Sequence, residues 1–123
     1  MNTCELFNYV YPLQHPLKNS IIHLTCSKFN IHEYPEVLVV NHDHMQRAAR
    51  QSGTVYGWFS YKYPKEVFIS DRIKLHNNRQ KEVLAHEIVH YCQYMIQSKY
   101  GIDQLEAEAD IIAIEVVQSL HGG

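Results

Sequence analysis

The stretch "VLAHEIVHYCQY", Val83 to Tyr94, decides the fold that we expect for this chain. It places His86, Glu87 and His90 in an otherwise apolar run, in the pattern His-Glu-x-x-His. Four residues of an α-helix turn through about 400° and rise about 6 Å, so the two histidines lie on one face of the helix. The pattern therefore predicts a helix on which two imidazoles can reach one metal ion, with a carboxylate beside them.

The neighbours of this pattern are apolar: Leu84, Ile88, Val89, Cys92 and Ile96. Two imidazoles without partners would be costly to bury in such surroundings, and a metal ion would satisfy both. The alternative is that His86 and His90 hydrogen-bond to the backbone or to sheet residues while Glu87 faces solvent. The pattern alone leaves these two interpretations open.

The last predicted helix, Asp103 toward Leu120, supplies further candidates. Helical spacing puts Gln104, Glu108, Glu115 and Gln118 on one solvated face, and puts Glu106, Asp110, Ala113 and Val117 on an apolar stripe. A carboxylate on an apolar stripe must be paired or bound to a metal. We therefore expect Glu106 to be the third metal ligand, and Asp110 to accept the other N–H of a ligand histidine.

Alternatives to this assignment remain. Asp103 and Glu106 are spaced as in a capping box, which would explain Glu106 without any metal. Glu108 is a weaker alternative ligand, and Glu115 is weaker still. The sequence "NHDH", His42 to His44, is expected to form a polar turn rather than a second metal site.

Composition limits the class of protein. The 123 residues are 46% hydrophobic, which fits a single domain spanning 1–123. The net charge is −2 and Lys and Arg form no cluster, so we expect no nucleic-acid partner. The start lacks a signal-peptide pattern and no run is long enough to cross a membrane, so we expect a soluble cytoplasmic protein. The three cysteines, Cys4, Cys26 and Cys92, are expected to be reduced.

The rest of the chain predicts an α+β fold with a small, mostly antiparallel sheet packed on the His-Glu-x-x-His helix and on the helix that follows it. Apolar periodicity, turn residues and caps indicate the elements. They are a helix at 19–29 capped by Asn19 or Ser20, a strand at 36–41, a short helix from Asp43 to Gly53, a strand pair in "TVYGWFSY" and "EVFIS", and helices from Asn78 to Tyr100, stopped by Gly101, and from Asp103 toward Leu120.

The residues "LAHEIVH" followed by "LEAEADIIA" resemble the gluzincin pattern, and the order of elements resembles the short ImmA/IrrE-like metallopeptidase domains. The resemblance covers about 54–120. It implies a minimal zincin-like domain in which His86, His90 and Glu106 bind zinc, Glu87 is the general base and Asp110 supports a ligand. The 16 residues from His90 to Glu106 (106 − 90) are a short interval for the family. The first helix should therefore bend or end before Tyr100.

The expected function is zinc-dependent hydrolysis of a peptide bond, with Glu87 acting on a zinc-bound water and a protein or peptide as substrate. A second chain could complete the cleft. The sequence shows no counterpart of the oxyanion-stabilising residue of larger relatives, although Tyr56, Tyr61, Tyr63 and Tyr100 are candidates. The alternative is therefore a zinc-stabilised protein-binding or regulatory module with weak or no catalysis.

Overall fold

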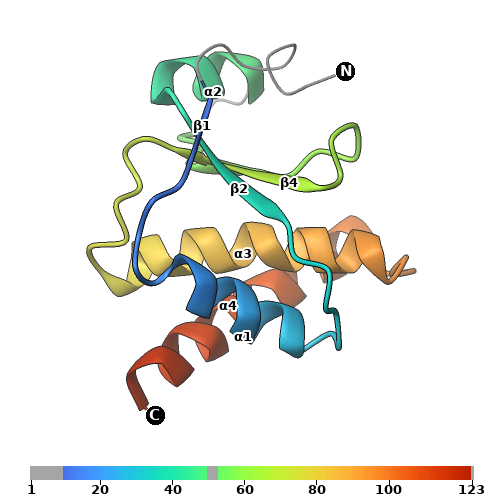
Figure 1. The fold of residues 1–123 in the computed structure, drawn as a ribbon. Helices are drawn as coiled ribbons and strands as arrows, with labels where there is room; N and C mark the ends of the chain where they lie inside the picture. The colour runs from blue at the N-terminus through green and yellow to red at the C-terminus, as the bar shows by residue number, and fades with distance from the viewer. Residues whose placement is uncertain (1–9, 50–52, 123) are drawn as a thin grey trace.

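The computed structural model describes residues 10–49 and 53–122 of the chain. Within these ranges a four-stranded sheet lies across a layer of helices, and a further short helix lies on the opposite face of the sheet (Figure 1). The elements in chain order are β1 (Tyr11–Pro12), α1 (Lys18–Ser27), β2 (Glu36–Val40), α2 (His42–Ala49), β3 (Gly57–Trp58), β4 (Glu66–Ser70), α3 (Asn78–Met95) and α4 (Ile102–Gly122). The expected α+β class is confirmed.

The sheet is mixed: two of its three strand pairs are antiparallel, as expected, and the central pair is parallel, which was not expected. Its strand order is β1-β2-β4-β3. The two-residue strands β1 and β3 pair antiparallel with β2 and β4, whereas β2 and β4 pair parallel from Glu36↔Glu66 to Val40↔Ser70. A parallel pair needs a crossover connection. The segment that holds α2 and β3 supplies it, by returning the chain to the starting end of the sheet before β4 begins.

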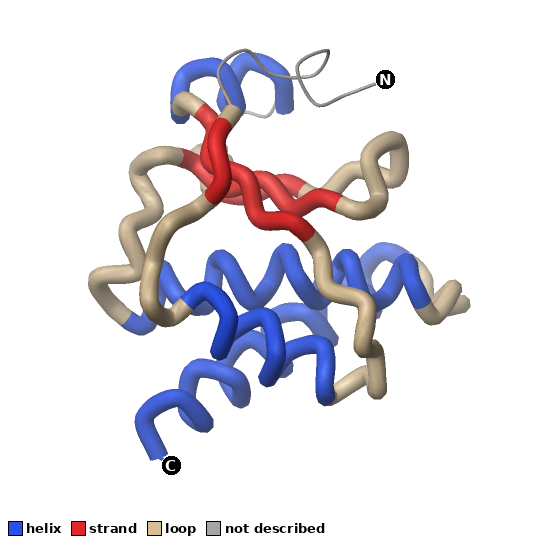
Figure 2. Tube along the Cα trace, in the orientation of Figure 1, coloured by secondary structure: helices blue, strands red, loops and turns tan. Residues whose placement is uncertain are grey.

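Alternation along the two central strands divides the core between the two faces of the sheet. Figure 2 shows α1, α3 and α4 together on one side of the strands, with α2 on the other. Side chains that face the three-helix side are Val37, Val39, Val67 and Ile69, which join the cluster of Ile21, Leu84 and Ile88. Side chains that face the other side are Leu38, Val40 and Phe68, which pack with Met45 of α2. Both faces of the central strands are therefore buried.

The end of α3 allows the short connection to α4. Gln97 adopts a left-handed conformation with φ 53°, the N–H of Ser98 bonds the carbonyl of Gln93, and the N–H of Gln97 bonds that of Tyr94. These bonds form a Schellman motif, which ends the helix at Met95. The expectation that the helix ends before Tyr100 is confirmed, and the assignment of Gly101 as its stop signal was wrong.

The beginnings of the helices were predicted with mixed success. Asn77 caps α3 by accepting the N–H of Gln80, close to the expected start at Asn78. The α1 cap is Leu17, which makes no side-chain hydrogen bond, so the expected capping by Asn19 or Ser20 was wrong. The reason is that the chain turns into α1 through backbone bonds from Lys18 to His15 and from Ile21 to Leu17.

The described residues also test two expectations about the class of protein. Cys26 and Cys92 are free and buried, as expected, while Cys4 lies outside the described residues. Among the described helices, none combines the length and the apolar character needed to cross a bilayer.

Candidate metal centre

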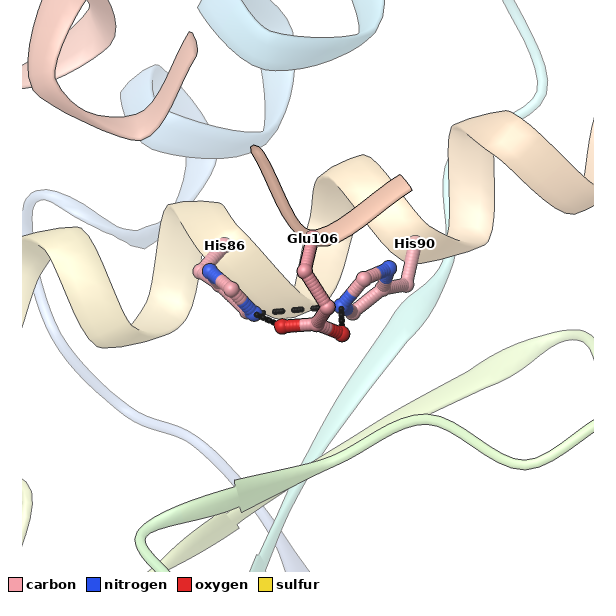
Figure 3. Close-up of side chains that lie close together, drawn as sticks. All are labelled: His86, His90 and Glu106. Atoms are coloured by element: carbon pink, nitrogen blue, oxygen red, sulfur yellow. Dashed lines mark hydrogen bonds and ion pairs between the residues drawn. The ribbon is translucent and has the colours of Figure 1, made fainter. Parts of the chain in front are cut away.

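Three side chains from α3 and α4 converge on one point (Figure 3). The Nε2 atoms of His86 and His90 lie 3.1 Å apart. The Glu106 carboxylate reaches both rings, with Oε2 3.2 Å from Nε2 of His86 and Oε1 2.8 Å from Nε2 of His90. The structure thus brings together the three residues that the sequence predicted as metal ligands.

Packing of the two helices makes this convergence possible. The α3 helix buries Leu84, Ala85 and Ile88 completely, which turns His86 and His90 away from that core toward α4. The α4 helix contributes small side chains to the contact, since Ala109 and Ala113 are both buried. Small residues let two helices approach closely, and the Glu106 side chain therefore reaches the imidazoles.

The outer ring nitrogens of both histidines are bonded to acceptors. Nδ1 of His86 lies 2.9 Å from Oδ1 of Asp110, and Nδ1 of His90 lies 2.8 Å from Oε1 of Gln93. An ionised carboxylate and an amide oxygen can only accept, so each Nδ1 carries the hydrogen. In the neutral rings, each Nε2 then presents a lone pair toward the other and toward Glu106.

Protonation of His86 is disfavoured in this arrangement. Burial lowers its pKa, and the neighbouring imidazole of His90 lowers it further, against the opposite effect of Glu106 and Asp110. A single proton would bind only one of the converging lone pairs, whereas one divalent cation can bind all of them. Ligand atoms about 2.0–2.1 Å from a tetrahedral zinc ion lie about 3.3 Å apart, close to the separations between these residues. The group therefore fits a metal ion.

Gln93 is a site residue that the sequence analysis missed. Only 4% of it is exposed. Its Nε2 donates to the carbonyl of Leu105 and to Oε1 of Glu108, both at 2.9 Å, which leaves Oε1 to accept from His90. The spacing of three residues from His90 on the same helix was the available signal, because residues at that spacing are neighbours on a helix surface.

The surroundings of the α4 carboxylates differ from the expectation. The side chains of Glu106 and Asp110 are 53% and 70% exposed, so neither is buried on an apolar stripe. Farther along α4, Ala113 and Val117 are buried. Glu106 and Asp110, in the first part of the stripe, line a pocket. The argument from burial was therefore wrong, although the same spacing directs Glu106 toward the histidines.

The residues considered as alternatives to Glu106 have other partners or lie elsewhere. Asp103 does not form a capping box with Glu106, because α4 begins at Ile102 and Asp103 lies within its first turn. The N–H of Gly101 bonds the side chain of Gln104 instead. Glu108, expected on the solvated face, is half-buried and bonds Gln93. Glu115 lies 3.5 Å from Lys28, outside the converging group.

Glu87 lies between the histidines in sequence and lines the same pocket. Desolvation raises its pKa to about 8, and the negative charge of Glu106 contributes to the rise. Carboxyl groups with a strongly raised pKa are concentrated at functional sites, and a proton-transfer group is most effective when its pKa lies near the working pH. The position and the environment of Glu87 suit proton transfer.

The pocket has a volume of about 730 Å³, within the range of about 300–1,000 Å³ that is usual for ligand sites. Its walls come from 54–59, which includes β3, and from one face each of α3 and α4. Of the four tyrosines considered as donors, Tyr56 lines it. The expected polar turn at His42 to His44 is instead the first turn of α2, and His42 is buried.

Comparison with known proteins gives no relative: no family model, curated protein or solved structure matches the chain significantly.

Proposed function

We propose that this protein is a zinc-dependent metallopeptidase of the gluzincin type, in which His86, His90 and Glu106 bind the metal and Glu87 is the general base. One observation carries the proposal. Two imidazoles whose Nδ1 hydrogens are already donated direct their Nε2 lone pairs, together with the Glu106 carboxylate, at a common point in a pocket. Two histidines and a glutamate are a known catalytic zinc set that leaves one coordination position open.

The metal would supply a Lewis acid for the substrate carbonyl and would lower the pKa of a water molecule. The protein residues do the rest. Asp110 and Gln93 hold the two rings in one tautomer and one orientation, as the outer partners of metal-binding histidines generally do. Glu87 takes a proton from the attacking water and delivers it to the leaving nitrogen.

The shape of the pocket supports a peptide as the substrate. Strand β3 is an edge strand of the described sheet. Its residues Gly57 and Trp58 line the pocket beside Glu87. An extended peptide can bind a sheet by adding to its outer strand. In that position its backbone would lie beside the pocket that also holds the three ligand atoms.

A zinc-stabilised binding module is the second candidate, because two described pocket residues that could stabilise an oxyanion have other partners. The ring of Tyr56 packs against His42 at a centroid distance of 5.4 Å, and the guanidinium of Arg79 lies 3.9 Å from the Glu82 carboxylate. Both residues line the pocket. This candidate predicts metal binding without turnover.

The first test is the metal content of protein purified without added metal, with the metal identified, since other divalent ions use the same donors. We expect about one zinc per chain, with loss of the metal in His86→Ala and in Glu106→Ala. Glu115→Ala is the matched control, because Glu115 lies on the same helix but pairs with Lys28. A metal-free protein that does not take up zinc would refute the proposal.

The second test measures cleavage of a randomised fluorescence-quenched peptide library and of unfolded casein. Glu87→Gln should retain the metal and lose turnover by a factor of roughly 100 or more, because it removes the proton carrier. Glu82→Gln is the control, since Glu82 lies on the same helix and lines the same pocket. Full turnover by Glu87→Gln would exclude the mechanism, and metal binding without cleavage would favour the binding module.

A further inference from the structure

Strand β3 and the Glu87 side chain are in unusually close contact. A Cβ atom built on Gly57 would lie 2.6 Å from Cγ of Glu87, 3.0 Å from Oε2 and 3.1 Å from Cδ. Real Cβ atoms essentially never lie below 3.0 Å from another heavy atom, so no other residue fits at position 57 with Glu87 where it is. None of the described glycines has a positive φ. Gly57 is therefore needed for space and not for its backbone conformation.

The backbones on the two sides of this contact are held in place. Gly57 pairs with Ile69 and Trp58 pairs with Phe68 in the β3–β4 ladder, and the N–H of Ser70 bonds the carbonyl of Tyr56 at 2.8 Å. The α3 helix is anchored by side chains that are completely buried, among them Leu84 and Ile88. Neither backbone can withdraw easily, so an added methyl group would have to displace the Glu87 side chain.

We propose that Gly57 is the positioning residue for Glu87. Because position 57 lacks a side chain, β3 lies directly on the Glu87 side chain and holds its carboxyl group in the pocket. The contact involves Cγ, which is one bond from the Cβ fixed to the helix, and not only the carboxyl end. Relief of a clash at Cγ requires rotation about the first side-chain bond, and this rotation carries the carboxyl group away. The catalytic consequence of the contact rests on the proposed function, whereas the contact itself does not.

A double-mutant cycle tests the contact without metal or substrate. Gly57→Ala should lower the thermal unfolding midpoint by roughly 5 °C or more, the size expected when an extra methyl group is forced into a packed site. In the Glu87→Ala background the same substitution should cause little or no loss, because Cγ is gone. Gly53→Ala is the control, since a Cβ there meets nothing within 4 Å. Equal shifts in the two backgrounds, or no shift in either, would overturn the proposal.

Crystal structures of the unaltered chain and of Gly57→Ala test the positioning role directly. We expect the Glu87 side chain to occupy another rotamer in the variant, with its carboxyl group displaced, while the side chains of His86, His90 and Glu106 stay in place. An unmoved Glu87 carboxyl group would overturn the proposal.

Kinetics separate a positioning role from a merely structural one. Gly57→Ala should keep the metal of the unaltered protein and lose kcat by a factor of roughly 100 with little change in KM, because misplacement of a catalytic group by about 1 Å can cost that much. Loss of metal together with kcat, or an unchanged kcat, would contradict positioning. If the unaltered chain cleaves nothing, the proposed function fails, while the cycle and the crystal structures still decide whether Gly57 positions Glu87.

Discussion

Two of the regions that bring a histidine together with acidic or hydroxyl side chains do so in opposite ways. At the end of the sheet, His42 is buried, its Nδ1 lies 2.7 Å from Oγ of Ser70, and its backbone N–H donates to Asp71. Ser70 also accepts the N–H of Arg72, and its hydroxyl group can either donate to His42 or accept from it, depending on the tautomer of the ring. Each of these three hydrogen bonds therefore joins a donor to an acceptor.

In the candidate metal centre, by contrast, the acceptors point at one another. His86 and His90 donate outward through Nδ1 and present Nε2 to each other and to Glu106. Their side chains are only 20% and 17% exposed, yet the region opens into the pocket. The comparison teaches that matched donors and acceptors can join structural elements, whereas acceptors that converge at a pocket wall leave a position that a cation can fill.

Metal removal should have the largest effect on this comparison. A chelator should lower the thermal unfolding midpoint of the unaltered protein by roughly 10 °C or more, because a metal that binds only the folded state stabilises it by several kcal/mol. His86→Ala should already unfold at the lower temperature and should not respond to chelator. Differential scanning calorimetry with and without chelator measures both effects. If the chelator leaves the unfolding midpoint of the unaltered protein unchanged, no metal stabilises the group of His86, His90 and Glu106, and the proposed difference between the two regions is wrong.

The role of Gln93 gives the next largest effect. Gln93→Ala should weaken metal affinity by roughly 10–100-fold, because the ring of His90 loses the partner that fixes its tautomer and orientation. Competition with a chromogenic chelator measures the affinity, with circular dichroism to confirm that the variant is folded. Gln118→Ala, on an exposed part of α4, should retain the affinity of the unaltered protein. Equal affinity in Gln93→Ala would show that the outer partner of His90 is dispensable.

The matched set at His42 should affect stability alone. His42→Ala should reduce the free energy of unfolding by about 1–3 kcal/mol, because it removes one of the two partners of the buried Ser70 hydroxyl and opens a small cavity. The metal content should stay the same as in the unaltered protein. Urea denaturation gives the first quantity and elemental analysis gives the second. Loss of metal in this variant would mean that the two regions are coupled across the sheet.

Sequence reasoning worked best where the relevant atoms lie on one helix. The spacing of His86, Glu87 and His90 places the three side chains by helical geometry alone, and the expected start at Asn78 agrees with the observed first residue of α3. It worked less well at the end of α3, where Gln97 takes the left-handed position that is usually occupied by glycine. A residue that rarely adopts this conformation gives no sequence signal for it.

Relations between elements were harder to predict. The parallel pairing of β2 with β4 depends on the path of the chain through α2 and β3, which short strands with similar patterns do not reveal. The exposure of Glu106 and Asp110 depends on where α4 leaves the core and enters the pocket. Glu106 lies beside the histidines as predicted, although the burial from which this was predicted does not occur.

The sequence by itself determined the α+β class, from the order of the predicted elements. It also determined the candidate ligands His86, His90 and Glu106, because helical periodicity converts spacing along the chain into a shared face of each helix. The tertiary structure alone decided the rest. It brought Leu105 and Glu108 of α4 against Gln93 and Gly57 against Glu87, and it joined β2 to β4 in parallel. The physical reason is that these are matters of orientation and of available space between elements, which are set when the elements pack and not by the local preference of any one segment.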